Sequence, residues 1–190
     1  MYIVFDTETT GLPRNWKAPI TDLNNWPRLV QLAWYVYDED GVELSAADYI
    51  VRPDGFVVPP EVSRIHGITH DDAMAKGKPI TEVLELFASD VARAEALVAH
   101  NMSFDEAIVR SEMLRAGMED IVAAKEKLCT KELATEFCAI EGQYGYKWPK
   151  LPELYNKLFP EPFAETHNAR ADAFGTAKCF WELKKRGVIK

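Results

Sequence analysis

The stretch YIVFDTETTGL, residues 2–12, carries the strongest fold signal in this chain. Its first four residues are all apolar, which is typical of a central strand buried on both faces. Asp6 and Glu8 follow at a spacing of two, so both side chains are expected on the same face at the end of that strand. Carboxylates held so close together repel, and each raises the pKa of the other. A divalent cation bound between them would offset this cost, since Mg²⁺ and Mn²⁺ prefer oxygen ligands. Solvated acids at a strand end are the alternative.

The segments that follow predict a mixed sheet flanked by helices. The β-rich run 29–37, turn residues 38–41 and a strand ending near Val51 predict an antiparallel meander with the first strand. Apolar periodicity then predicts helices over residues 61–65, 81–94, 103–116, 131–140, 151–158 and 169–186, and short strands over 96–99 and 128–130. This order predicts a single α/β domain over residues 1–190. Residues 13–28 show no period and are expected to form a loop or short insert near the first carboxylates.

A third acid, Asp105, follows the short strand 96–99. Ser103 and Glu106 have the spacing of a capping box, which predicts that a helix begins at Ser103 and places Asp105 in its first turn. An acid there is favoured by the helix macrodipole alone. The same field keeps the carboxylate ionised, so Asp105 is also a candidate metal ligand.

A fourth acid, Asp172, lies near the start of the last predicted helix. Asn168 is a plausible N-cap, which places Asp172 at the opening turn and His167 in the preceding loop. From a loop, His167 can fold over the same site as Asp172. A surface histidine is the simpler explanation for that residue.

Charge and cysteine usage restrict the class of protein. The formal net charge of −8 argues against a broad nucleic-acid-binding surface, although bound cations would reverse the local field around an acidic site. Three cysteines without a C-x-x-C pair suit reduced thiols. We find no apolar run long enough to span a membrane, and no basic segment precedes the first apolar run. The expectation is a cytoplasmic protein that does not bind membranes.

Three motifs occur in a recognisable order: F-D-T-E-T-T-G-L, A-H-N-x-x-F-D and H-N-A-x-x-D-A. Together they resemble the DEDDh exonucleases of the DnaQ-like family, which includes the polymerase III proofreading subunit, the TREX nucleases, ribonuclease T and oligoribonuclease. The segments His66-Gly67-Ile68-Thr69 and Leu151-Pro152-Glu153-Leu154-Tyr155 resemble further family segments. The resemblance extends from Tyr2 to about Lys184. All four acids and the histidine of the family pattern are present, which makes the combined signal strong.

The resemblance implies a ribonuclease H-like fold, with a five-stranded mixed sheet flanked by α-helices. It also implies a 3′–5′ exonuclease that releases nucleoside 5′-monophosphates by a two-cation mechanism with Mg²⁺ or Mn²⁺. In that pattern Asp6, Glu8, Asp105 and Asp172 hold the cations, and His167 is the general base for the attacking water. The expected partner is nucleic acid with a free, single-stranded 3′ end. Replication or repair proteins are conceivable partners, but no sequence feature identifies one.

The family pattern also implies substrate contacts. Residues expected along the path of the 3′-terminal nucleotide are Thr9, Gly11, Leu12, Asn101 and Phe104. Phe104 also lies on the apolar stripe of its predicted helix, and Leu12 could be a loop anchor. Four basic residues could meet phosphates or could be solvated surface charges: Lys147, Lys150, Lys157 and Arg170.

Several alternatives remain open. We expect single-stranded DNA as the substrate, with an exoribonuclease similar to ribonuclease T or oligoribonuclease as the main alternative. A non-catalytic nucleic-acid-binding module is disfavoured because no acid of the pattern is lost. The short stretch after Asp172 favours a free-standing exonuclease over a proofreading subunit. His66 and His70 have zinc-like spacing, but Gly67 and Thr69 argue against a helix there.

Overall fold

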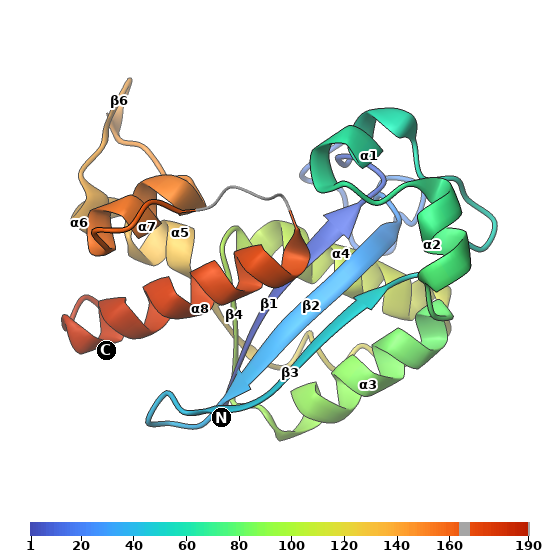
Figure 1. The fold of residues 1–190 in the computed structure, drawn as a ribbon, viewed down its shortest axis with the longest axis horizontal. Helices are drawn as coiled ribbons and strands as arrows, with labels where there is room; N and C mark the ends of the chain where they lie inside the picture. The colour runs from blue at the N-terminus through green and yellow to red at the C-terminus, as the bar shows by residue number, and fades with distance from the viewer. Residues whose placement is uncertain (164–167, 190) are drawn as a thin grey trace.

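The computed structural model describes residues 1–163 and 168–189, and Figure 1 shows its arrangement. The strands are β1 (Tyr2–Thr9), β2 (Leu29–Tyr37), β3 (Glu43–Ile50), β4 (Ala96–Ala99), β5 (Glu126–Cys129), β6 (Glu141–Gly142) and β7 (Gly145–Tyr146). The helices are α1 (Pro60–His66), α2 (His70–Lys76), α3 (Ile80–Arg93), α4 (Met102–Arg115), α5 (Thr130–Leu133), α6 (Thr135–Cys138), α7 (Leu151–Leu158) and α8 (Ala169–Lys185).

The main sheet has five strands in the order β3-β2-β1-β4-β5. β1 pairs antiparallel with β2 and parallel with β4, while β2 pairs antiparallel with β3. β4 and β5 are parallel. The prediction of a five-stranded mixed sheet flanked by helices is therefore confirmed, and so is the antiparallel meander of the first three strands.

Successive side chains of β1 enter two different cores. Ile3 and Phe5 pack in the core formed with α3 and α4, whereas Val4 packs in the core formed with α7 and α8. Figure 1 shows α8 crossing one face of the sheet with α4 behind it. Because a strand alternates its faces, Asp6 and Glu8 follow Val4 toward α8, and Thr7 follows Phe5 toward α4.

Two predicted element starts or ends are wrong. β1 continues through Asp6 and Glu8 to Thr9, since these residues still pair with β2, so the carboxylates lie inside the strand near its end. α4 begins at Met102, not Ser103. Its N-cap is Asn101, in a left-handed conformation (φ 92°) and without a side-chain capping bond, so the predicted capping box is not formed.

Other local elements differ from the predicted pattern. The helix predicted over residues 131–140 is two short helices, α5 and α6, and α2 was not predicted. The small hairpin formed by β6 and β7, whose strands are only two residues long, was not predicted either. Such short elements leave too little periodicity to detect.

No helix among the described residues combines the length and the apolar character needed to cross a membrane. The three cysteines, Cys129, Cys138 and Cys179, are buried and free, as the reduced-thiol prediction requires.

Candidate functional site

Three carboxylates meet where β1 approaches the start of α8. Asp6, Glu8 and Asp172 each offer an oxygen atom, and these oxygens all lie within 4.8 Å of one another. The alternation of β1 turns its two acids toward α8. The third acid, Asp172, is placed by the cap of α8. The Asn168 side chain accepts from the backbone N of Arg170, so the helix begins there and Asp172 lies in its first turn. The predicted N-cap is thus confirmed, and residues from opposite ends of the chain form one cluster.

Two carboxylates of this cluster, Asp6 and Glu8, resist ionisation. Burial, then the charges of Asp105, Asp172 and Glu8, raise the pKa of Asp6 well above its usual value. Burial and the charge of Asp172 are also the leading causes that raise the pKa of Glu8 from 4.5 to about 8. An all-oxygen donor set with excess negative charge is what hard divalent cations prefer. The residues therefore fit a hard divalent cation.

Asp105 lies outside that group of three and is held from the other side of β1. It is buried, and its Oδ1 accepts hydrogen bonds from the Thr7 backbone N (3.0 Å) and the Thr7 hydroxyl (2.7 Å). Burial raises the pKa of Asp105 to about 7, while the two hydrogen bonds from Thr7 act in the opposite direction. Its charge still reaches Asp6, whose pKa it raises. Asp105 therefore interacts electrostatically with the three-carboxylate cluster, although it is not one of its members.

Gln31 is a positioning residue that the sequence analysis missed. It is buried on β2 opposite Glu8, and its Oε1 accepts from the backbone N of Ala169 (3.2 Å), the first residue of α8. Its Nε2 donates to Asp48 Oδ1 (2.7 Å) on β3. Gln31 therefore anchors the start of α8, and with it Asp172, to the sheet. A polar residue within the apolar run 29–37 was the available signal.

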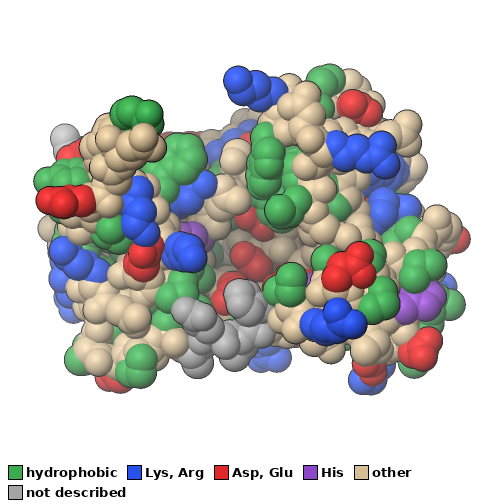
Figure 2. Space-filling view, turned by 90° about the horizontal axis from the view of Figure 1, so that it is seen from above, with side chains coloured by type: hydrophobic (Ala, Val, Ile, Leu, Met, Phe, Trp, Pro, Cys, Tyr) green, Lys and Arg blue, Asp and Glu red, His purple; other side chains and the backbone are tan. Residues whose placement is uncertain are grey.

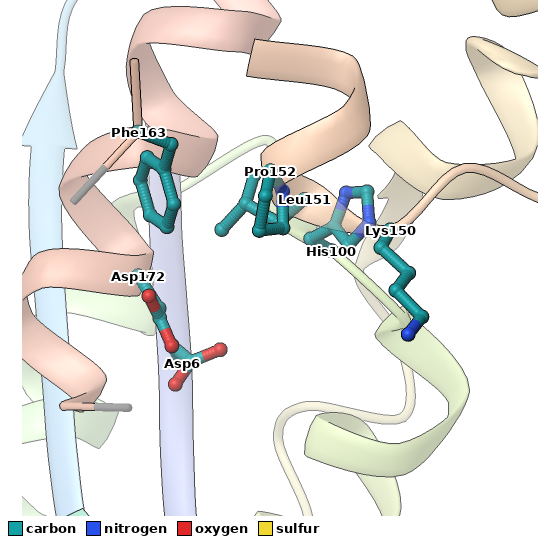
Figure 3. A pocket seen from close by; sticks show the side chains of 7 residues that line it. All are labelled: Asp6, His100, Lys150, Leu151, Pro152, Phe163 and Asp172. Atoms are coloured by element: carbon teal, nitrogen blue, oxygen red, sulfur yellow. The ribbon is translucent and has the colours of Figure 1, made fainter. Parts of the chain in front are cut away.

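A cavity of about 430 Å³ opens beside the carboxylates. Figure 3 shows Asp6 and Asp172 close together at one end, with Lys150 and His100 across the cavity. Its other lining residues are Leu151, Pro152 and Phe163. The cavity joins the acidic cluster to the start of α7, where a cationic side chain is available for an anionic ligand.

His100 is structural in this arrangement. Its Nε2 lies 3.1 Å from the Pro149 carbonyl oxygen, which can only accept, so Nε2 carries the proton and Nδ1 accepts from the Thr130 hydroxyl (2.9 Å). Burial, the largest cause, and the charge of Lys131 lower the pKa of His100 to about 4, although the hydrogen bond to Pro149 acts in the opposite direction. The ring is neutral at pH 7 and ties β4 to the segment before α7.

The predicted substrate residues after β1 form a tight turn with an exposed tip. The Thr9 hydroxyl donates to the Gly11 carbonyl oxygen (2.7 Å). Gly11 has φ 148°, a conformation that favours glycine. Leu12 is 72% exposed, so it is not the buried loop anchor considered as its alternative.

The two predicted substrate residues near α4 are partly committed to the fold. The Asn101 Oδ1 accepts from Lys131 Nζ (2.5 Å). Phe104 packs against the core but also meets Trp16, with ring centroids 5.7 Å apart. Trp16 is 54% exposed and comes from the predicted insert 13–28, so the insert does reach the neighbourhood of α4.

Among the lysines predicted to meet phosphates, only Lys150 lines the cavity. Lys147 pairs with Glu153 (2.6 Å) and Lys157 donates to the Cys138 carbonyl oxygen (3.2 Å), so neither reaches toward the cavity as Lys150 does.

His66 ends α1 and His70 begins α2, so the zinc alternative on a single helix face is wrong. The predicted general base, His167, lies outside the described residues.

Comparisons with known proteins agree with this geometry. The family model for exonucleases, RNase_T, matches residues 3–180. A PolC-type DNA polymerase III from Staphylococcus aureus is 27% identical over 192 residues, which cover 99% of this chain. The chain spans only 12% of that protein's length.

Solved structures show the same fold. E. coli Exonuclease I in complex with a dT13 oligonucleotide matches with a TM-score of 0.77 and 18% identity, covering 97% of this chain and 41% of that one. Exonuclease X in complex with 5′ overhanging duplex DNA matches with a TM-score of 0.65 and 25% identity, covering 98% and 93%. These similarities confirm the ribonuclease H-like, DnaQ-like resemblance.

Proposed function

The chain belongs to the exonuclease family of the RNase_T model, and from that premise we propose that it is a DEDDh-type 3′–5′ exonuclease. It removes nucleoside 5′-monophosphates from the 3′ ends of single-stranded DNA and depends on two divalent cations, Mg²⁺ or Mn²⁺. The observation that carries the proposal is the cluster of Asp6, Glu8 and Asp172, whose oxygens lie within 4.8 Å of one another. Like charges so close together in a partly buried site gain most when cations bind.

The reaction is hydrolysis of the last phosphodiester bond. The oxygen of a water molecule attacks the phosphorus, the bond to the 3′-oxygen of the preceding nucleotide breaks, and that oxygen leaves protonated with the shortened strand. Bound cations supply positive charge for the phosphoryl oxygens and lower the pKa of water. Asp6, Glu8 and Asp172 would hold them, and Asp105, fixed by Thr7, would complete the ligand set.

His167 has the role of general base that accepts the proton of the attacking water. An imidazole with an ordinary pKa near ~6.5 suits proton transfer at neutral pH. The His167→Ala variant should bind Mn²⁺ almost normally and lose about 10²-fold or more in kcat. Unchanged turnover would remove His167 from the mechanism.

The substrate side of the proposal rests on the loop after β1 and the start of α4. Leu12 is exposed beside the cluster's strand, and Phe104 pairs with Trp16, which offers apolar surface for the terminal base. Thr9 and Gly11 shape the turn that presents Leu12, and Asn101 turns the chain into α4. The preference for single-stranded DNA is supported by the oligonucleotide bound to Exonuclease I, a protein of the same fold.

Product analysis tests the function directly. Single-stranded DNA and RNA of matched sequence, labelled once at the 5′ end and once at the 3′ end, should be digested with Mg²⁺, with Mn²⁺ and with EDTA. We expect 3′-label released first as a mononucleotide from DNA, and no release in EDTA or by Asp6→Asn. Preferential digestion of RNA would favour the exoribonuclease. No release from either substrate would contradict the enzyme assignment.

A further inference from the structure

Exposed aromatic side chains gather on the small β6–β7 hairpin. Tyr144 at its tip is 93% exposed, Tyr146 is 49% exposed and Trp148 is 60% exposed. Tyr146 ends β7, and Trp148 follows two residues later in the segment that leads to α7. Large aromatic groups clustered in the open are typical of binding surfaces, because folding alone leaves them few contacts.

Two lysines connect these rings to the candidate active site. Lys131 Nζ lies 4.2 Å from the centroid of the Trp148 ring and also donates to the Asn101 Oδ1, at the start of α4. Lys150, two residues after Trp148, lines the cavity that contains Asp6 and Asp172. Lys131 therefore links Trp148 to the start of α4, and Lys150 lies between Trp148 and the cavity that contains the carboxylates.

The base of the hairpin is held in place rather than loosely attached. The Lys147 backbone N donates to the Ile140 carbonyl oxygen (2.8 Å), which closes the hairpin. His100 donates to the Pro149 carbonyl oxygen (3.1 Å), which fixes the segment between Trp148 and Lys150 to β4. A surface prepared in this way loses little conformational freedom when a ligand binds.

We propose that Lys131, Tyr144, Tyr146, Trp148 and Lys150, together named the hairpin face, bind the single-stranded DNA on the 5′ side of the bond that is cleaved. This inference rests on the proposed function. Bases stack on aromatic rings whatever their identity, and lysines accompany the phosphates. With a net charge of −8, the protein needs such a local cationic surface to hold an anionic strand.

The hairpin face lies where the 5′ part of a bound DNA strand would leave the active site. The proposed contacts for the terminal nucleotide, Leu12 and Phe104, lie on the side of Trp16 and the insert. The scissile phosphate belongs at the carboxylates, so the remaining nucleotides must leave on another side. Figure 2 shows acidic side chains in a central hollow; the lobe at its left, which carries α5, α6 and α7 in Figure 1, presents hydrophobic and basic side chains together with some acidic ones.

Binding measurements with oligonucleotides of two lengths test the hairpin face. Fluorescence anisotropy of labelled dT15 and dT3 in EDTA gives two values of Kd without turnover. Trp148→Ala should reduce the preference for dT15 over dT3 by about tenfold, and Trp148→Phe should restore most of it, because one stacked base contributes roughly that factor. Lys131→Met and Lys150→Met should each reduce the slope of log Kd against log salt by about 0.7 for dT15.

Matched controls lie on other parts of the molecule. Leu44→Ala removes an exposed apolar side chain from β3, and Lys76→Met removes an exposed lysine from α2; neither should alter the preference for dT15. A Trp148→Ala variant with the wild-type preference for dT15 would overturn the inference. Failure of the proposed function is distinguishable, because it would appear as no nucleotide release by the wild type, whatever the values of Kd.

Discussion

At the scale of single residues, the site depends on the alternation of β1. Asp6 and Glu8 face α8 and Asp172, while Thr7 between them faces α4 and holds Asp105 with two hydrogen bonds. The spacing of the two acids made their shared face predictable. Thr7 was not predicted as a functional residue, because its role appears only when Asp105, 98 residues away, is brought beneath the strand.

Thr7→Val tests this role with little change of shape. The Thr7 hydroxyl lowers the pKa of Asp105, so its loss should raise that pKa further above about 7. A hydrogen bond to a charged group is worth roughly 1.5–3 kcal/mol, so Mn²⁺ affinity at pH 7 should fall about tenfold or more. Because the effect is one of protonation, the affinity should recover partly at pH 9. An equal loss at both pH values would indicate a purely structural role. Thr81→Val, at an exposed position on α3, is a threonine control.

The raised pKa values also predict how stability depends on pH. The pKa of Asp105 rises from 3.8 to about 7 and that of Glu8 from 4.5 to about 8 on folding. Their protonated forms stabilise the fold fully below about pH 4, and this contribution is lost as pH rises through 7 and 8. The Tm of the metal-free protein should therefore fall between pH 5 and pH 8. Added Mn²⁺ should raise the Tm more at pH 8 than at pH 5, and equal increments would contradict this account.

At the scale of elements, α8 is positioned by its first turn. Asn168 caps the helix and Gln31 fixes its first residue to β2, so the place of Asp172 depends on two polar groups. The cap was predictable from local sequence. The bond from Gln31 spans 138 residues, and no local pattern reveals such a partner.

Gln31→Leu should separate positioning from folding. The change leaves the buried Ala169 backbone N without its acceptor, which costs about 1–3 kcal/mol of stability, whereas the exposed Asp48 is rehydrated. A displacement of Asp172 by about 1 Å should lower kcat about 10²-fold. Gln31→Glu, which keeps an acceptor for Ala169, should retain more of the helix position but adds charge near Glu8. Wild-type kcat in Gln31→Leu would show that α8 is held by packing alone.

The insert 13–28 is attached to α4 by a buried charge network. Glu112 is 1% exposed and accepts from Arg28 Nε (2.8 Å) and the Leu29 backbone N (3.1 Å), and Arg115 lies 2.9 Å from the same carboxylate. Arg115 also donates to the carbonyl oxygens of Leu23 (2.5 Å) and Trp26 (2.7 Å). Lack of periodicity correctly indicated a loop, but the contacts that order it could not be read from sequence.

Glu112→Ala should be among the most destabilising single changes. Removal of the shared acceptor leaves the Leu29 backbone N–H without its acceptor and Arg28 and Arg115 without their buried counter-charge, at a cost of about 3–5 kcal/mol in unfolding free energy. Glu119→Ala, on the loop after α4, is the acidic control and should change stability by less than about 0.5 kcal/mol. Urea unfolding of both variants measures the difference. A loss below about 1 kcal/mol for Glu112→Ala would show that the network contributes little.

At the scale of the whole molecule, the sheet and its covering helices followed from the sequence. Strands such as 29–37 and helices such as 81–94 carry long apolar patterns, and both exist within a residue or two of their predicted bounds. The β6–β7 hairpin, the helix α2 and the division of residues 131–140 were missed, because short elements depend on contacts made after folding. The four acids were predicted from the motifs. Only the structure shows that Asp172 meets Asp6 and Glu8 on one face of β1, while Asp105 is held by Thr7 from the other.

Asp6, Glu8 and Asp172, gathered from the two ends of the chain, are predicted to form one cation site. Calorimetric titration of Mn²⁺ into the wild type, Asp172→Asn and Asp71→Asn at pH 7.5 tests it most directly, with Asp71 an exposed acid on α2. We predict that Asp172→Asn weakens Mn²⁺ binding by about tenfold or more, while Asp71→Asn binds as the wild type does. Wild-type Mn²⁺ affinity and stoichiometry in Asp172→Asn would contradict the account.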